Sequence, residues 1–167
     1  MRSNIILIGM PATGKSTVGV ILAKRLGMDF ADTDLLICKR AKATLPDIIN
    51  SEGLDGLMRH EEAVGRSLQL KNCVIATGGS MVLYEDAMQS LAQSGTIIWL
   101  NTELEQLIER LPADLHERGI VCPEGQGPTE LFAQRLPLYM KYSDITINCH
   151  GSTEEVVEAI LTALHSA

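Results

Sequence analysis

Short apolar runs alternate with helix-length segments along this chain. Strong runs lie at residues 4–9, 73–77, 96–100 and 145–148, and a weaker one lies at 28–32. The strong runs are rich in β-branched residues, and helical spacing of apolar positions follows the first and the last of them. This alternation predicts an α/β fold in which helices flank a parallel sheet.

Two helices have clear boundaries in the sequence. The first should begin near Lys15 and end at Gly27, because glycine readily takes the left-handed conformation that closes a helix. The last should follow Ser152, which forms a capping box with Glu155 three positions later. Both predictions rest on local signals that are independent of the rest of the fold.

Two segments depart from the alternation. Residues 43–70 have a helical pattern, interrupted near Gly53 and Gly56, which indicates a helical insertion over the sheet. Residues 112–128 hold three of the six prolines and three of the fourteen glycines. Such a punctuated segment is typical of a mobile functional loop, and a tolerated surface insertion is the alternative.

Composition narrows the class of protein. A chain of 167 residues with 46% hydrophobic content is long enough for one folded domain, and its formal net charge of −7 disfavours nucleic acid or an anionic membrane as the main partner. The four cysteines lack the spacing of redox or zinc motifs, which favours reduced thiols in the cytoplasm. No apolar stretch approaches the roughly 18 residues of a membrane span.

The strongest motif is Gly-Met-Pro-Ala-Thr-Gly-Lys-Ser at residues 9–16, which fits GxxxxGK[ST] and lies between an apolar strand and an amphipathic helix. Glycines let backbone N–H groups surround a polyphosphate at the helix N-terminus. We expect Lys15 to reach the terminal phosphates of a nucleotide and Ser16 to bind Mg²⁺. The strand and helix context disfavours the alternative of a glycine-rich turn that binds nothing.

Other nucleotide-binding classes lack their motifs here. The chain has no Asn-Lys-x-Asp for reading guanine, no acidic residue at the end of its core strands, and no Asp-Gly-x-Pro-Arg run of the adenylate kinase type. Among the classes of nucleotide-binding protein considered, a small kinase that acts on a metabolite is therefore the one that fits.

Asp32 and Asp34 follow the weak strand, so both are expected at the carboxyl edge of the sheet, where ligands bind in open α/β folds. Asp32 is the best candidate for contacting Mg²⁺ through water, and Asp34 for holding and polarising an attacking hydroxyl. The same residues can also cap the following helix. The two roles are compatible.

Taken in order, the motifs resemble the shikimate kinase family. The resemblance covers nearly the whole chain and rests on the phosphate loop, Asp32-Thr33-Asp34, Arg59 followed by Glu61 and Glu62, Ala76-Thr77-Gly78-Gly79, Arg118, and Arg135-Leu136-Pro137-Leu138-Tyr139. It implies a three-layer P-loop kinase fold with a five-stranded parallel sheet, a helical substrate-binding insertion and a lid. The core would comprise residues 1–32, 71–111 and 128–167, the insertion 33–62 and the lid 112–127.

The function implied by the resemblance is transfer of the ATP γ-phosphoryl group to shikimate, which gives shikimate 3-phosphate and ADP in aromatic amino-acid (chorismate) biosynthesis. Lys15, Asp34 and Arg118 would be catalytic, and Ser16 and Asp32 would serve Mg²⁺, Asp32 through water. The nucleotide would contact Ala12, Thr13, Gly14, Lys15, Ser16, Thr17, Arg110 and Arg118, and shikimate would contact Asp34, Arg59, Gly78, Gly79 and Arg135. A cytoplasmic monomer without nucleic-acid or membrane partners is expected.

Three residues depart from the family pattern. Ala12 stands where glycine is common and suits only a backbone without positive φ. Ser80 replaces a third glycine, and Gly119 replaces a proline after Arg118, which predicts a looser lid. These departures leave open a kinase for another hydroxy acid, such as gluconate, or a nucleotide-binding module without turnover.

Although the chain is acidic overall, its candidate lysine and arginine residues are predicted to lie close together in space. Arg59 and Arg135 are expected to converge on one carboxylate, because a guanidinium binds a carboxylate in two places. The alternative for Arg59 is an ion pair with Glu61 or Glu62 on its own helix. Together with Lys15, Arg110 and Arg118, these arginines should gather around one cleft.

Overall fold

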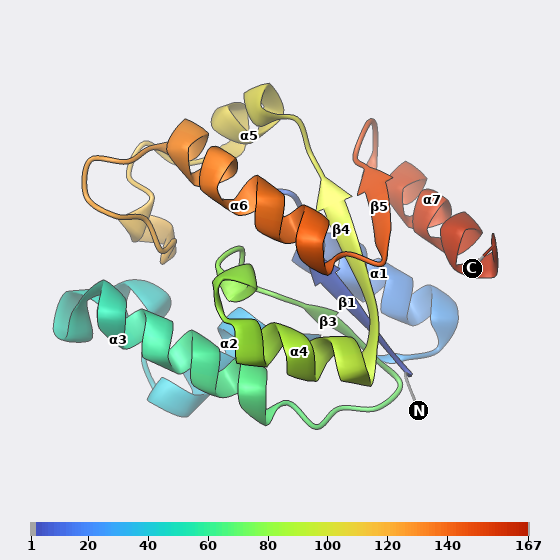
Figure 1. Ribbon diagram of the computed structural model, residues 1–167, viewed down its shortest axis with the longest axis horizontal. Helices are drawn as coiled ribbons and strands as arrows, with labels where there is room; N and C mark the ends of the chain where they lie inside the picture. The colour runs from blue at the N-terminus through green and yellow to red at the C-terminus, as the bar shows by residue number, and fades with distance from the viewer. Residues whose placement is uncertain (1–2, 167) are drawn as a thin grey trace.

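A five-stranded parallel sheet lies at the centre of the computed structural model, which describes residues 3–166 (Figure 1). The strand order is β2-β3-β1-β4-β5, and each neighbouring pair is parallel. The strands are β1 (Asn4–Ile8), β2 (Asp29–Asp32), β3 (Cys73–Ala76), β4 (Gly95–Asn101) and β5 (Ile145–Asn148). The predicted α/β class is confirmed, and all five apolar runs form strands.

Helices cover both faces of this sheet (Figure 1). α1 (Lys15–Leu26) and α7 (Thr153–Ser166) pack on one face, and α4 (Glu85–Ser94), α5 (Leu104–Arg110) and α6 (Pro128–Tyr142) pack on the other. Successive side chains of a strand point to opposite faces. Ile5 of β1 therefore packs in the cluster that contains Val18 of α1, whereas Ile6 packs in the cluster that contains Tyr139 of α6.

The predicted boundaries of the first and last helices are confirmed. Gly27 closes α1 with φ 65°, and its N–H donates to the carbonyl of Ala23. The N–H of Ser152 donates to the Glu155 carboxylate, and the N–H of Glu155 donates to the Ser152 hydroxyl, which completes the capping box. None of the helices within residues 3–166 combines the length and hydropathy needed to cross a bilayer.

The helical insertion consists of α2 (Thr33–Ala41) and α3 (Leu45–Ser67). The path of α3 breaks at Gly53, whose φ of 72° and ψ of −179° are not helical, while Gly56 remains inside the helix. A separate apolar cluster joins these two helices to Val121 in the segment between α5 and α6. The insertion and that segment therefore pack against each other over one edge of the sheet.

The proline-rich segment is well packed along part of its length. A short 3-10 helix, η2 (His116–Arg118), is followed by Ile120, Val121 and Cys122, which are all buried. Only 2% of the surface of Cys122 is accessible, and its thiol lies against the carbonyl of Gln126.

Gly119 has a left-handed backbone and lies close to α3 in this segment, and the looser lid expected from the sequence stays a prediction. Its φ is 68°, and its N–H donates to the carbonyl of His116 at the end of η2. A Cβ atom added there would lie 2.2 Å from Cβ of Leu45 on α3. Proline, whose φ is fixed at about −65°, cannot take this conformation. Glycine is required where the segment docks on α3.

Replacing Gly119 with alanine is expected to lower the free energy of unfolding by about 3 kcal/mol, because a left-handed backbone and a steric overlap add together. Gly125 is the matched control, since it also has a positive φ, 79°, but an added Cβ would meet nothing within 4 Å. Gly125→Ala should cost only about 1 kcal/mol. Urea unfolding of both variants measures the difference, and equal losses would contradict the docking of Gly119 on Leu45.

Candidate active site

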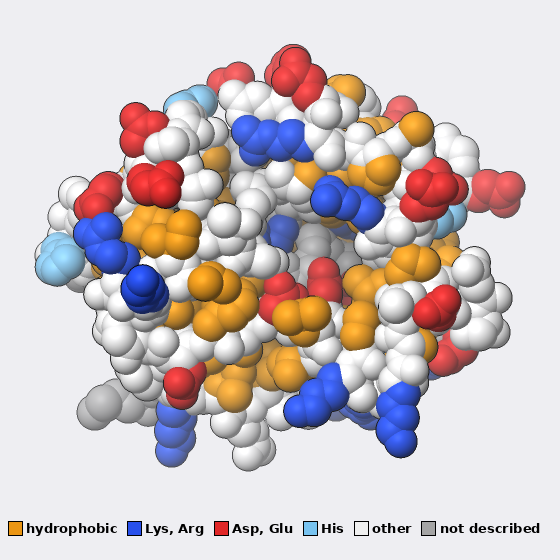
Figure 2. All heavy atoms as spheres, turned by 180° about the vertical axis from the view of Figure 1, so that it is seen from behind, with side chains coloured by type: hydrophobic (Ala, Val, Ile, Leu, Met, Phe, Trp, Pro, Cys, Tyr) orange, Lys and Arg blue, Asp and Glu red, His pale blue; other side chains and the backbone are white. Residues whose placement is uncertain are grey.

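A cavity of about 320 Å³ lies at the carboxyl edge of the sheet. It is bounded by the phosphate loop, α2, α3, the loop after β3, residues 118–121 and α6. Figure 2 shows a hollow near the middle of one face, with Lys or Arg side chains inside it and above it and Asp or Glu side chains along its lower edge. Cations and carboxylates therefore meet within one small space.

Lys15 occupies the phosphate-loop side of this cavity. It is 7% exposed, and its Nζ donates to the carbonyls of Gly9 at 2.8 Å and Met10 at 2.7 Å. Burial lowers the pKa of Lys15 to about 8, although the nearby Asp34 carboxylate opposes the shift. The loop thus holds the amine at the place where a phosphate would meet the helix N-terminus.

The rest of the phosphate loop also faces this space. Ala12, Gly14, Ser16 and Thr17 line the cavity, whereas Thr13 is buried beside it, and its hydroxyl has no hydrogen-bond partner among the described residues. The structure therefore brings all of the predicted loop residues except Thr13 to the cavity.

Ala12 takes the conformation that the sequence argument excluded for it. Its φ is 65°, in the left-handed region. The side chain makes this conformation unfavourable, because Cβ crowds the following carbonyl oxygen. The phosphate loop therefore has the left-handed backbone typical of glycine at position 12, and Ala12 is strained in it.

Ala12→Gly is accordingly expected to raise the free energy of unfolding by up to about 1 kcal/mol. Ala159 is a useful control because it is exposed within α7, where glycine should instead lower stability by about 1 kcal/mol. Denaturant titration of both variants measures the two changes in the free energy of unfolding, which should have opposite signs. A destabilised Ala12→Gly protein would show that the strain at Ala12 is not real.

Asp32 contacts Ser16 and caps α2 at the same time. The hydroxyl of Ser16 donates to Oδ2 of Asp32 at 2.5 Å, and Oδ1 of Asp32 accepts the N–H of Asp34 at 2.9 Å. The capping interpretation of Asp32 is therefore confirmed, and its second carboxylate oxygen is left beside Ser16. A hydroxyl and a carboxylate side by side suit Mg²⁺, which prefers oxygen ligands and keeps several waters when few protein groups bind it.

Asp34 lies two residues after Asp32, in the first turn of α2, and lines the cavity. Burial and the negative charge of Asp32 raise the pKa of Asp34 to about 6, while the Lys15 cation pulls it down. Gly78 lies against it, since a Cβ atom added at Gly78 would come within 2.8 Å of the Asp34 carboxylate. This glycine leaves room for the carboxylate at the cavity wall.

Arg135 enters the cavity from α6 and is only 2% exposed. Its Nη2 donates to the carbonyl of Val121 at 2.6 Å, and its Nη1 has no hydrogen-bond partner within residues 3–166. Tyr139, one turn later, donates its hydroxyl to the carbonyl of Gly79 at 2.7 Å and stacks on Trp99. α6 therefore holds a buried guanidinium at the cavity wall, with one nitrogen that has no hydrogen-bond partner in the described part of the chain.

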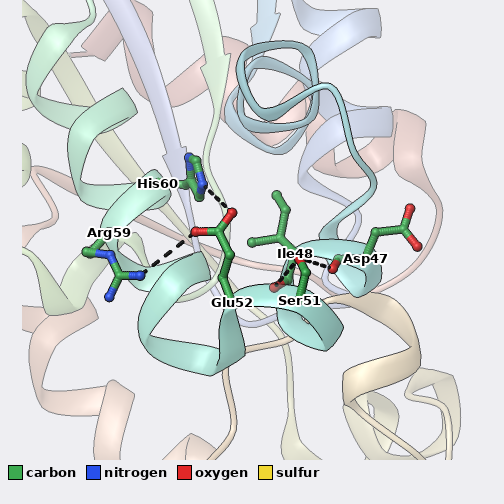
Figure 3. A network of polar contacts seen from close by, with 6 residues as sticks. All are labelled: Asp47, Ile48, Ser51, Glu52, Arg59 and His60. Atoms are coloured by element: carbon green, nitrogen blue, oxygen red, sulfur yellow. Dashed lines mark hydrogen bonds and ion pairs between the residues drawn. The ribbon is translucent and has the colours of Figure 1, made fainter.

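The structure does not bring Arg59 to this cavity, which corrects the expected convergence with Arg135. Its side chain is 67% exposed and lies 3.8 Å from Glu52, an acidic residue on the other side of the break at Gly53. Figure 3 shows Arg59 and His60 both directed toward Glu52. Arg59 therefore pairs with Glu52, and not with Glu61 or Glu62 as the alternative interpretation of the sequence expected.

Helix register explains the position of Arg59. Successive residues of an α-helix turn by about 100°, so residues two apart point in nearly opposite directions. Glu61 lies on the buried face with Leu57 and Val64, and it lines the cavity. Arg59 must then face away, whereas Met58, three residues before Glu61, lies near its face.

The other two predicted arginines occupy different places. Arg118 is exposed at the end of η2 and lines the cavity, whereas Arg110 is exposed at the end of α5 and is not among its lining residues. Of the five cations expected around one cleft, Lys15, Arg118 and Arg135 are there.

Glu61, Ser80 and Tyr84 form a part of the site that the sequence argument missed. The Glu61 carboxylate is 3% exposed and accepts hydrogen bonds from the hydroxyls of Ser80 and Tyr84, both at 2.5 Å. Burial raises the pKa of Glu61, and these two hydrogen bonds oppose the shift. A carboxylate in line with Leu57 and Val64 on an otherwise apolar helix face was the available signal.

The amino-acid sequence is similar to known proteins along nearly its whole length. The family model for shikimate kinase matches residues 11–165. A shikimate kinase of Symbiobacterium thermophilum is 39% identical over 166 residues, which cover 96% of this chain and 95% of the relative.

Solved structures give the same result. A shikimate kinase from Acinetobacter baumannii in complex with shikimate superimposes with a TM-score of 0.87 at 31% identity, covering 98% of this chain and 93% of that one. For the shikimate kinase of Aquifex aeolicus, the TM-score is 0.85 at 32% identity, with 97% of this chain and 96% of that one covered.

Proposed function

Because the chain belongs to the shikimate kinase family, we propose that it transfers the γ-phosphoryl group of ATP to a hydroxyl of shikimate, giving shikimate 3-phosphate and ADP in aromatic amino-acid biosynthesis. The proposal rests above all on one cavity in which Lys15 of the phosphate loop faces Asp34 and the buried Arg135. A nucleotide phosphate and a small hydroxylated acid can meet there.

The nucleotide occupies the phosphate-loop side. Backbone N–H groups of residues 12–17 and the N-terminus of α1 bind the phosphate oxygens. Lys15 moves its hydrogen bonds from the carbonyls of Gly9 and Met10 to the transferring phosphate, and Arg118 approaches from the opposite wall. Arg110 lies further out, where it can contact the adenine.

The acceptor occupies the other side. Arg135 binds the carboxylate of shikimate through Nη1, and Asp34 accepts a hydrogen bond from the attacking hydroxyl near Gly78 and Gly79. An oxygen–phosphorus bond forms to shikimate as the bond between the γ-phosphorus and the bridging oxygen of ADP breaks. The hydroxyl proton passes to Asp34 and then to solvent, and Lys15 and Arg118 balance the charge on the phosphoryl oxygens.

Mg²⁺ is the metal that this site would take, with Ser16 as a direct ligand and Asp32 as a partner through water. When bound, the ion neutralises the charge of the β- and γ-phosphates. The protein's own contribution is to hold the Ser16 hydroxyl against Asp32 beside the loop.

The parts of the chain divide the work in the same way. Residues 33–62 bind the acceptor, residues 112–127 form a lid that carries Arg118, and the remaining core binds the nucleotide. Closure of the lid excludes water and so limits ATP hydrolysis. The four free cysteines support a cytoplasmic enzyme, and we expect it to act as a monomer without nucleic-acid or membrane partners.

Release of ADP in a coupled assay tests this function. With ATP and Mg²⁺, shikimate should stimulate ADP release at least tenfold over the blank without an acceptor, and quinate and gluconate should stimulate it far less. Stimulation by gluconate alone would reassign the acceptor. Tight nucleotide binding without stimulation by any acceptor would instead indicate a binding module without turnover.

A further inference from the structure

The acceptor half of the cavity contains a carboxylate that the proposed phosphoryl transfer does not use. Glu61 reaches it from α3, and its two oxygens each accept one short hydrogen bond, Oε1 from Ser80 and Oε2 from Tyr84. Both donors come from the short stretch that follows β3, on either side of η1 (Met81–Leu83). The bonds therefore tie α3 to the loop that carries Gly78 and Gly79.

Glu61 also lies in the electrostatic field of Arg135. Asp34, Glu61 and Arg135 line the same cavity. Burial raises the pKa of Glu61, and the positive charge of Arg135 partly opposes that shift. Glu61 and Arg135 are 3% and 2% exposed. Two opposite charges that line one cavity and are themselves almost fully buried attract each other strongly, because little water screens them.

A direct ion pair between Glu61 and Arg135 is not formed among the described residues. Nη1 of Arg135 has no hydrogen-bond partner, and the Glu61 oxygens are occupied by Ser80 and Tyr84. Two hydroxyl donors, one on each carboxylate oxygen, therefore take the place that the guanidinium could take. The guanidinium nitrogen is left to bind an anion that enters the cavity.

We propose that Ser80 and Tyr84 are positioning residues that hold Glu61 away from Arg135 and so keep Arg135 available for the carboxylate of the acceptor. This inference rests on the proposed function for the identity of that acceptor. It also gives a purpose to the serine that stands in place of the third glycine of the family pattern. The hydroxyl acts on substrate binding through Glu61 and does not itself contact the reacting atoms.

Loss of either hydroxyl should release Glu61 toward Arg135. Ser80→Ala and Tyr84→Phe are each expected to raise KM for shikimate about tenfold, because the acceptor must then displace a buried ion pair. Both kcat and KM for ATP should change by less than about twofold, since an interaction made equally in the ground and transition states affects KM alone. Ser94→Ala and Tyr142→Phe are matched controls, since neither residue lines the cavity.

Glu61→Gln separates positioning from packing. The amide keeps the shape of the side chain and a hydrogen-bonding group for each hydroxyl, but it cannot form an ion pair with Arg135. Adding Ser80→Ala to Glu61→Gln should then raise KM for shikimate by less than about twofold. A tenfold effect of Ser80→Ala in both backgrounds, or no effect in either, would overturn the proposal.

A crystal structure of unliganded Ser80→Ala protein gives a readout that needs no turnover. A Glu61 oxygen within 4 Å of the Arg135 guanidinium would support the proposal, and a Glu61 side chain left in its present position would overturn it. If the wild-type protein fails to phosphorylate shikimate, the proposed function fails, yet this structure still decides whether Ser80 keeps Glu61 from Arg135.

Discussion

Replacing Lys15 with methionine is expected to lower kcat/KM for shikimate phosphorylation by a factor of about 10³ or more, because the transition state loses its buried cation at the phosphoryl oxygens. Methionine has a similar length and fills the same space, but it leaves the carbonyls of Gly9 and Met10 without their donor. Steady-state kinetics with ATP and shikimate measure the loss.

Lys24→Met provides the control for Lys15→Met. Lys24 lies in the last turn of the same helix and is exposed, so its loss should leave kcat/KM within about twofold of the wild-type value. Circular dichroism before the assay shows whether each variant is folded. A folded Lys15→Met protein with nearly full activity would place the phosphates elsewhere.

Asp34→Asn is the second large effect, with an expected fall in kcat of about 10² to 10⁴. Asparagine can still receive a hydrogen bond from the hydroxyl, but it cannot take up the proton. Shikimate binding should therefore persist while turnover is lost, and binding can be followed by calorimetric titration. Asp55→Asn, an exposed position on α3, is the control that should retain activity.

The pH profile gives a second readout for Asp34. Its pKa is raised to about 6, so the carboxylate is charged above that pH and protonated below it. Only the charged form can accept a proton, and kcat/KM of the wild-type enzyme should fall about tenfold per pH unit below pH 6. The small residual activity of Asp34→Asn should lack this acidic limb. A wild-type rate that stays flat down to pH 5 would contradict the assigned role.

Features with local causes were predictable from the sequence. The five strands, the closing glycine of α1 and the Ser152–Glu155 capping box are all marked by patterns in neighbouring residues, and each forms as expected. The phosphate loop is also local, since its residues lie between β1 and α1 and most of them line one cavity. Continuous segments of this kind can be placed without knowledge of the tertiary structure.

Features that depend on distant contacts were not predictable in the same way. The φ of Gly119 is fixed where its segment docks on Leu45, far away in the sequence. The direction of the Arg59 side chain depends on which face of α3 is buried. The order of motif residues along the chain does not determine that face. The break at Gly53 also brings Glu52 to Arg59, which no helical spacing across that region would predict.

The placement of Glu61 shows how the missing information could be recovered. An acidic residue spaced with Leu57 and Val64 on a buried helix stripe needs polar partners. Its partners, Ser80 and Tyr84, follow a different strand, so only the fold identifies them. In the sequence Ser80 is only a departure from the third glycine of the family pattern, whereas in the fold its hydroxyl donates to Glu61.

Phosphorus NMR of a mixture of the wild-type protein with ATP, Mg²⁺ and shikimate tests the central claim most directly. The account predicts that the ATP signals give way to those of ADP together with a new phosphate monoester signal, coupled to the single proton of the ring carbon that bears it. Conversion of ATP to ADP and inorganic phosphate alone, or unchanged ATP in the presence of shikimate, would contradict phosphoryl transfer from the Lys15 side of the cavity to the Asp34 side.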